Sequence, residues 1–559
     1  MVETLRTQVL IAGAGPVGLT AAMSLASYGI SVVVVERRRR GEPPSVKSNH
    51  VSARSMEIFR RLGVASAFRN AGLPPDYPND VSYRTTTIGT ELARIHIPCR
   101  RDRYGDKSGP DGWWPTPEPP HRINQIYLEP ILFGRVDALP EVTILAQTEF
   151  ETFEQTEAGV VAAVRSLEDW RVLNIECDYL VGCDGGRSVV RSAIGAKLHG
   201  DAVVQSVQST CIRAPGLIER MSARPAWGTF SVNPRRSGNV YAIDGKETWL
   251  VHNYLRRGED DFASVDRDAC LRLILGVGPD FHYEIISKED WIGRRLVADH
   301  FRDRRVFICG DAAHLWVPMA GYGMNAGIAD AANLSWLLAG ALQGWADAGI
   351  LGAYEAERLP ITQQVSHFAM DHAISLSKLR SAIPDRIEEP SPEGDAIRAR
   401  FGRELYDLNV NQYCCGGLNF GYFYDASPII AYDDETQPGY TLYDFVPSSV
   451  PGCRTPHVWL EDGRSLYDAM GPGYTLLRFD PAIDVSGLVD AAARRKVPLV
   501  VLDVRSSDEA LTTLYPQSLV LSRPDQHVAW RGNAVPDKPD ELIDLIRGAA
   551  TAFRTRRAA

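Results

Sequence analysis

The sequence predicts an α/β protein whose first domain is built on a parallel sheet. Two apolar, β-branched runs, residues 7–12 and 30–35, are separated by glycines and by a small-residue segment of helical length at residues 19–29. Strand, turn, helix and strand in this order form the βαβ unit that joins two parallel strands. Further glycines follow two later apolar runs, which indicates that several loops approach one bound ligand.

The glycines after the first run have the spacing of a dinucleotide cradle. Gly13 permits a tight turn, Gly15 lets the backbone approach a pyrophosphate, and Gly18 lets the helix pack against the strand. Glu36 closes the second run, where an acid accepts hydrogen bonds from a ribose. This Rossmann-like motif fits FAD and NAD(P) equally. Its predicted contacts are Gly13, Gly15, Pro16, Val17, Gly18, Glu36 and Arg37, although Arg37 begins an arginine run that also fits a solvated turn.

Length and composition limit the classes of function. A chain of 559 residues is too long for one core, so two or three domains are expected. The net charge of -10 argues against a nucleic-acid partner. Nine cysteines show neither metal-ligand nor CxxC spacing, so we expect reduced thiols and no metal site. The apolar N-terminal run divides into strand, turn and helix, so we expect a soluble, cytoplasmic protein without a membrane partner.

Two further loops combine an aspartate with glycine after an apolar run. Cys183-Asp184-Gly185 follows YLVG, and Gly310-Asp311 follows RRVFIC. The second loop leads through several glycines into a helical pattern, so its peptide dipoles can lie against a flat, electron-rich ligand. The complete G-x-G-x-x-G motif occurs once, so a second nucleotide would dock without a Rossmann domain of its own.

These three motifs, in this order, resemble those of the FAD-dependent aromatic hydroxylases, single-component flavoprotein monooxygenases built like para-hydroxybenzoate hydroxylase. The chain looks most similar to the phenol and chlorophenol hydroxylase branch. The resemblance implies a Rossmann-like FAD-binding domain, an inserted mixed β-sheet substrate domain and a thioredoxin-like C-terminal domain. The expected bounds are 1–80, 120–200 and 295–385 for the FAD-binding domain, 81–119 and 201–294 for the substrate domain, 386–439 for a linker and 440–559 for the last domain.

The resemblance also implies further cofactor contacts. Asp311 would accept hydrogen bonds from the flavin ribityl chain, or serve as a helix N-cap. Asp184, Gly185 and Arg187 would contact FAD and NAD(P)H, unless Arg187 is an ion-pair partner of Asp184. Lys47 stands where relatives carry Pro-Arg-Ala, and it lacks the planar fork of arginine. The other expected contacts are Arg54, Gln125 (or a surface helix glutamine), Gly310, Pro318, Gly321, Gly323, Met324 and Asn325.

The implied reaction is hydroxylation of a phenolic aromatic substrate with NAD(P)H and O2, through a flavin C4a-hydroperoxide. A phenol has an unperturbed pKa of about 10, so the site must hydrogen-bond or deprotonate its hydroxyl. Tyr241, His252 and Tyr254, in a segment that alternates like antiparallel strands, are candidates, although each also fits sheet packing. His50 with Asn49, and Pro318, are further candidates. His314 is expected to be structural, and Trp316 and Met319 to form an apolar wall.

Alternatives remain on the same fold. The enzyme could be an epoxidase or a Baeyer–Villiger monooxygenase, or the chain could be a non-catalytic protein that binds flavin and an aromatic ligand. A flavin halogenase is disfavoured because the W-x-W-x-I-P segment is absent. The last domain lacks CxxC, so packing or contact within a homodimer is its expected role.

Overall fold

The computed structural model describes residues 3–47, 49–259, 261–317 and 321–550. Its first sheet has the strand order β14-β15-β8-β1-β2-β5, and β6 and β7 extend it as a meander beside β8. The pairs β1·β2, β1·β8, β2·β5 and β8·β15 are parallel, so their carboxyl ends share one edge. The strands are β1 (Glu3–Ala12), β2 (Val32–Val35), β5 (Val142–Leu145), β6 (Thr148–Gln155), β7 (Val160–Ser166), β8 (Val172–Gly182), β14 (Arg302–Asp303) and β15 (Val306–Ile308).

Helices cover this sheet because its parallel strands are apolar on both faces. All four residues of β2 are buried, and so are nine residues of α1. Helix α7 packs on α1 and carries fifteen buried residues, among them Trp336. The helices of the first two-thirds are α1 (Pro16–Ser27), α2 (Ala53–Arg61), α3 (Ala65–Arg69), α4 (Gln125–Asp137), α5 (Val189–Ala193), α6 (Arg267–Leu275), α7 (Tyr322–Gln343) and α8 (Gly352–Ser381).

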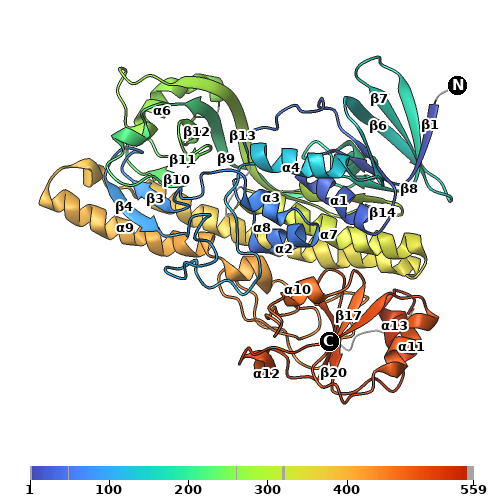
Figure 1. Ribbon diagram of the computed structural model, residues 1–559. Helices are drawn as coiled ribbons and strands as arrows, with labels where there is room; N and C mark the ends of the chain where they lie inside the picture. The colour runs from blue at the N-terminus through green and yellow to red at the C-terminus, as the bar shows by residue number, and fades with distance from the viewer. Residues whose placement is uncertain (1–2, 48, 260, 318–320, 551–559) are drawn as a thin grey trace.

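A second sheet has the order β16-β13-β9-β12-β11-β10-β3-β4. The antiparallel alternation predicted over residues 228–254 forms β10, β11 and β12. The long strands β9 and β13 pair with each other, and Figure 1 shows them arching from the first domain into this sheet. The strands are β3 (Val81–Arg84), β4 (Glu91–Ile95), β9 (Leu198–Arg213), β10 (Gly228–Ser231), β11 (Gly238–Ala242), β12 (Thr248–Tyr254), β13 (Glu284–Ala298) and β16 (His314–Leu315).

The segment expected to be a linker, residues 386–439, contains the helix α9 (Pro392–Tyr413). Phe401 and Leu405 on α9 are buried in the same apolar core as Val81 and Trp249 of the second sheet. Figure 1 shows α9 running along β3 and β4. The helix forms because apolar residues recur three and four positions apart, and it covers the sheet like an integral part of that domain.

The C-terminal domain has a thioredoxin-like topology, with the sheet order β18-β17-β19-β20. Strands β17 and β18 are parallel, whereas β19 runs antiparallel to β17 and β20 antiparallel to β19. Figure 1 places this domain below α7 and α8. Its elements are α10 (Leu466–Ala469), β17 (Tyr474–Arg478), α11 (Ser486–Arg494), β18 (Leu499–Asp503), α12 (Leu511–Leu514), β19 (Leu519–Ser522), β20 (Val528–Gly532) and α13 (Pro539–Ile546).

Buried ion pairs attach the C-terminal domain to the rest of the chain. Arg523 donates to both carboxylate oxygens of Glu357 on α8, at 2.6 and 2.8 Å. Arg454 pairs in the same way with Glu57 on α2. All four side chains are almost fully buried, so the orientation of this domain depends on matched charges. Within the described ranges, no helix is both long and apolar enough to cross a membrane.

Candidate active site

The three glycines after β1 have different surroundings. Gly13 has a φ of +103°, and a Cβ there would lie 2.4 Å from the Cys183 carbonyl oxygen. A Cβ on Gly18 would lie 2.0 Å from the carbonyl oxygen of Gly13. No atom lies within 4 Å of the position of a Cβ on Gly15, which is the N-cap of α1. The first and third glycines therefore serve packing, and the second leaves space at a helix N-terminus, where an anion binds well.

Glu36 lies beside this cradle and is held by it. Its carboxylate accepts a hydrogen bond from the Ala14 backbone N–H at 2.9 Å and also contacts Arg38. Arg38 in turn pairs with Glu129 on α4, to which Gln125 donates at 2.8 Å. Gln125 and Glu36 thus belong to one polar network.

Arg37, by contrast, is 71% exposed and pairs with Glu149, which fits the solvated turn. Pro16 and Val17 form the first turn of α1, and Val17 lies against Gly310.

Asp184 caps a short helix. Its carboxylate accepts hydrogen bonds from the Ser188 hydroxyl at 2.5 Å and from the Val189 and Val190 backbone N–H groups. Arg187 is exposed, and no ion pair joins it to Asp184 among the described residues. Gly185 has a φ of +78°, which shapes the turn between them.

The Asp311 loop and the start of α7 face the same space. Asp311 follows β15, its exposed side chain lines a pocket, and partial desolvation there raises the pKa of its carboxyl group. Gly310 and Gly321 have φ of +60° and +64°, and no atom lies within 4 Å of a Cβ position on Gly323. The side chain of Asn325 accepts from the Ser52 N–H at 2.8 Å, which fixes the 50–52 loop against α7. Pro318 and Met319 lie outside the described residues.

His314 is structural, because it contacts Asp330 at 2.8 Å in the buried interior.

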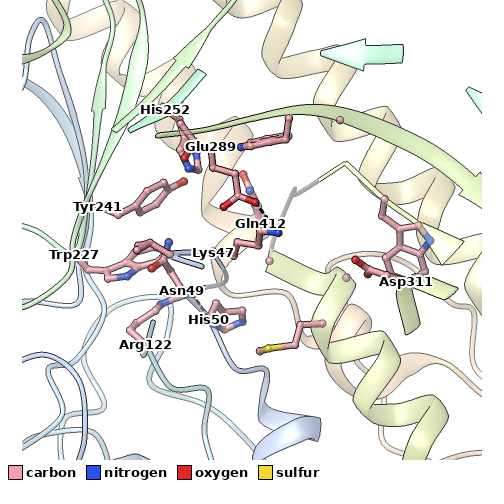
Figure 2. A pocket seen from close by; sticks show the side chains of 18 of the residues that line it. Lys47, Asn49, His50, Arg122, Trp227, Tyr241, His252, Glu289, Asp311 and Gln412 are labelled. Carbon is pink, nitrogen blue, oxygen red and sulfur yellow. Dashed lines mark hydrogen bonds and ion pairs between the residues drawn. The ribbon is translucent and has the colours of Figure 1, made fainter. Parts of the chain in front are cut away.

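A cavity of about 320 Å³ lies between the start of α7 and the second sheet. Figure 2 shows Asp311 on one side of it and Trp227, Tyr241 and His252 on the other. The pocket therefore combines a polar edge rich in glycines with an aromatic wall, which suits a planar ligand. Its lining residues are Val46, Lys47, Asn49, His50, Arg122, Ser209, Trp227, Tyr241, His252, Glu289, Trp291, Ile292, Gly293, Asp311, Trp316, Gly321, Gly323, Met324, Gln412 and Tyr413.

The two histidines of the pocket are uncharged at neutral pH. Burial and the nearby Arg122 hold the pKa of His50 well below its usual value. Arg122 Nη1 donates to His50 Nδ1 at 2.6 Å, so the proton of the neutral ring is on Nε2. Burial lowers the pKa of His252 to about 4. Neither histidine is a strong base, but each can form a hydrogen bond to a ligand hydroxyl.

The tyrosines differ in their access to the pocket. Burial raises the pKa of Tyr241 well above 10, so it remains a neutral phenol. Its oxygen is 3.2 Å from the Asn239 amide nitrogen, which leaves the Tyr241 hydroxyl hydrogen free to bond a ligand. Tyr254 does not line the pocket; its hydroxyl accepts from Asn239 at 2.7 Å and Arg380 covers its ring. Tyr254 and Tyr241 are therefore linked through the Asn239 amide, which donates to both hydroxyl oxygens.

Arg54 is buried against the C-terminal domain rather than at the pocket. Its guanidinium donates to the Gln526 side chain and the Asp525 carbonyl, and pairs with Glu57. The expectation of a cofactor contact therefore does not fit its position. Lys47 does line the pocket, where its ammonium group lies 2.7 Å from the Glu289 carboxylate.

The sequence predictions missed most of the aromatic side of the pocket. Arg122, Trp227, Trp291, Gln412 and Tyr413 all line it, and the last two end the helix α9. Helical spacing of apolar residues in the 392–413 segment was the signal for α9. Nothing in the local pattern around Arg122 or Trp227 marks either residue as a ligand contact.

Comparisons with known proteins agree with this geometry. A family model for an FAD binding domain matches residues 6–369, and one for the C-terminal domain of aromatic-ring hydroxylases matches residues 448–550. The FAD-dependent monooxygenase apdD of Emericella nidulans is 29% identical over 573 residues, covering 98% of this chain and 90% of that protein. Phenol 2-monooxygenase of a Pseudomonas species is 28% identical over 589 residues, covering 98% and 93%. The solved structure of the rebeccamycin biosynthetic enzyme RebC with reduced flavin has a TM-score of 0.88 and 32% identity, over 98% of this chain and 100% of that one.

Proposed function

Because this chain belongs to the FAD-binding, aromatic-ring hydroxylase family of flavoprotein monooxygenases, we propose that it hydroxylates a phenolic ring with NAD(P)H as reductant and O2 as oxidant. The observation that carries the proposal is the two-sided pocket. One side is formed by Asp311, Gly321 and Gly323, and the other by Trp227, Tyr241 and Trp291. When bound, FAD supplies the electron transfer and oxygen activation that no side chain provides.

The residues of the cradle fit FAD. The space beside Gly15, at the N-terminus of α1, suits the pyrophosphate. The Asp311 carboxylate is the acceptor that the hydroxyls of the ribityl chain require. The open position at Gly323 lets the first turn of α7 direct backbone N–H groups at the electron-rich ring edge.

The aromatic side binds and orients the substrate. Tyr241 donates its hydroxyl hydrogen to a substrate oxygen, since Asn239 already occupies its acceptor side. His252 is neutral and accepts a hydrogen bond from a substrate hydroxyl, which shifts electron density into the ring. Trp227 and Trp291 exclude water from the ring that reacts.

Three finer points belong to the same proposal. The complete cradle occurs once, so we propose that NAD(P)H binds transiently on the surface of the assembled domains. All nine cysteines are free thiols, which supports a reducing, cytoplasmic location. We also propose a homodimer, with the exposed Trp459 of the C-terminal domain as a candidate contact, which light scattering would test.

The test of function is a screen of the FAD-loaded protein against phenols, aryl acids and polycyclic phenols. We expect one class to accelerate NAD(P)H oxidation and to yield a product heavier by one oxygen on an intact ring. A lactone or an epoxide as the product would replace hydroxylation with one of the alternative reactions. Bound FAD without any aromatic-dependent oxidation would contradict the proposal.

A further inference from the structure

Arg122 is a buried positive charge inside the pocket. It precedes α4, is 5% exposed and lines the cavity on its aromatic side. Its Nη1 donates to the neutral His50 ring, and no Asp or Glu forms an ion pair with it among the residues that the structure describes. Figure 2 shows Arg122 beside His50 and below Trp227.

The other buried arginines have acceptors. Arg358, Arg454 and Arg523 each pair with a buried carboxylate. Arg191 has none within reach, but it donates to two backbone carbonyls, those of Ala312 and Gly186. Arg122 differs from all of them, because its one protein acceptor is a neutral ring nitrogen. A buried guanidinium without a counter-charge is unfavourable, and this favours a ligand that brings an anion.

The surroundings of Arg122 hold its guanidinium in place without neutralising it. The Trp227 ring centroid lies 4.4 Å from the guanidinium carbon, and that of Tyr413 lies 5.7 Å away. Asp111, the acid whose charge acts on Arg122, is already paired with Arg103 and accepts from Trp114 Nε1 at 2.7 Å. Lys47, the other cation of the pocket, is paired with Glu289. The positive charge of Arg122 is therefore available to a ligand.

We infer that Arg122 binds a carboxylate of the substrate, which makes the substrate a hydroxylated aromatic acid. Nη1 is engaged by His50, whereas Nε and Nη2 have no protein partner among the described residues. These two donors form one edge of the guanidinium plane, and they match the two oxygens of a carboxylate. The aromatic ring of such an acid would continue along Trp227 and Tyr413. The inference rests on the proposed function for the identity of the site as the substrate site.

A carboxylate fits better than a phenolate. A phenolate presents one oxygen, so it cannot form the two parallel hydrogen bonds that a carboxylate forms with this edge. The pocket also lacks a strong base to form a phenolate, because His50 and His252 are poor bases. An aromatic acid, in contrast, is ionised at neutral pH before it enters.

The test measures binding of the FAD-loaded protein by equilibrium dialysis. The probes are 6-hydroxy-2-naphthoate, its methyl ester and 2-naphthol, which share the ring and the hydroxyl group. We expect the acid to bind about tenfold to hundredfold more tightly than the ester, the range for a hydrogen-bonded charge pair. Arg122→Met should abolish this preference, and Arg122→Lys should retain part of it, because the charge remains without the second donor.

The double variant Lys47→Met/Glu289→Gln is the matched control, because it removes the other ion pair of the pocket without a change in net charge and should leave the preference unchanged. Equal binding of acid and ester by the unaltered protein would overturn the inference, and this arm needs no variant to fold. The inference would also be overturned if the preference survived Arg122→Met, or if it disappeared in the charge-balanced double variant Lys47→Met/Glu289→Gln. Loss of FAD affinity in Arg122→Met with the preference intact would reassign Arg122 to the cofactor.

Failure of the proposed function is read separately. If the acid binds more tightly than the ester, and this preference requires Arg122, but no oxygenated product forms, the carboxylate site is supported and the proposed hydroxylation is refuted. If an oxygenated product forms from phenols while acid and ester bind equally, hydroxylation stands and the role of Arg122 falls.

Discussion

Two glycines of the cradle, Gly15 and Gly18, should separate FAD binding from folding. A Cβ on Gly18 would lie 2.0 Å from the carbonyl oxygen of Gly13, where Cβ contacts below 3.0 Å essentially never occur. Gly18→Ala therefore requires a backbone shift of about 1 Å, at a cost on the order of 1–3 kcal/mol, as for overpacking in a core. The cost arises with or without the cofactor, because both clashing atoms belong to the protein.

Gly15→Ala should behave in the opposite way. Gly15 has φ −76° and ψ 178°, which alanine adopts easily, and no atom lies within 4 Å of the new methyl group. The loss of a glycine N-cap and the reduced entropy of the unfolded chain nearly cancel, so the free energy of unfolding without FAD should change by less than about 1 kcal/mol. The methyl group would occupy the space assigned to the pyrophosphate. Losing one charge-assisted hydrogen bond there raises the Kd for FAD about tenfold to hundredfold.

The assay compares both variants with the unaltered protein in two measurements. Denaturant unfolding of the FAD-free protein, followed by tryptophan fluorescence, reports stability, and titration with FAD reports affinity. We expect Gly18→Ala to lower the unfolding midpoint and Gly15→Ala to lower FAD affinity at an unchanged midpoint. The assignment of these glycines is refuted if Gly15→Ala destabilises the FAD-free protein as much as Gly18→Ala, or if it binds FAD normally.

Three further predictions concern the pocket and the interface between domains. Tyr241→Phe removes a hydroxyl donor and should lower kcat/KM about tenfold to hundredfold, with FAD content unchanged; a normal kcat/KM would exclude that hydrogen bond. His252 has a folded-state pKa of about 4 against 6.5 unfolded, so the unfolded chain binds more protons between these values. Stability should therefore fall by at most about 3 kcal/mol as pH decreases from 6.5 to 4, and His252→Asn should flatten that part of the unfolding profile. Glu357→Leu removes one of the two carboxylates that pair with Arg523 and should destabilise the contact with the C-terminal domain by about 1.5–3 kcal/mol, seen as faster proteolytic release of that domain; an unchanged rate would contradict this account.

The three loops proposed to hold the cofactor could be located from the sequence because each follows the end of a strand. Gly13, Asp184 and Asp311 each follow an apolar run, and these runs became β1, β8 and β15. The three strands are neighbours and parallel, so their carboxyl ends meet at one edge. A motif that follows a parallel strand therefore lies beside the motifs that follow the neighbouring strands, because the carboxyl ends of these strands share one edge of the sheet.

Arg54 shows where local reasoning fails. The family resemblance implies a cofactor contact for Arg54, the second residue of α2, but its acceptors, Asp525 and Gln526, lie 471 and 472 residues later in the chain. Because α2 is buried, Arg54 can contact either the pocket or the C-terminal domain. The choice depends on the charges that the distant domain supplies, which no local pattern reveals.

Tyr241 and His252 on the aromatic side of the pocket were predicted, but the other residues of that side were missed for a related reason. Arg122, Trp227 and Tyr413 belong to three separate segments, and they meet because α9 packs on the second sheet while the segment before α4 passes beneath it. These residues meet across the core between α9 and the second sheet, so the distances between them depend on the volumes of the side chains packed in that core. Such a wall can be reshaped by substitutions that shift α9, without change to the strand ends that form the cradle. If the proposed function holds, substrate choice in this chain depends on packing between distant segments, whereas the proposed cofactor contacts lie in loops that can be recognised in the sequence.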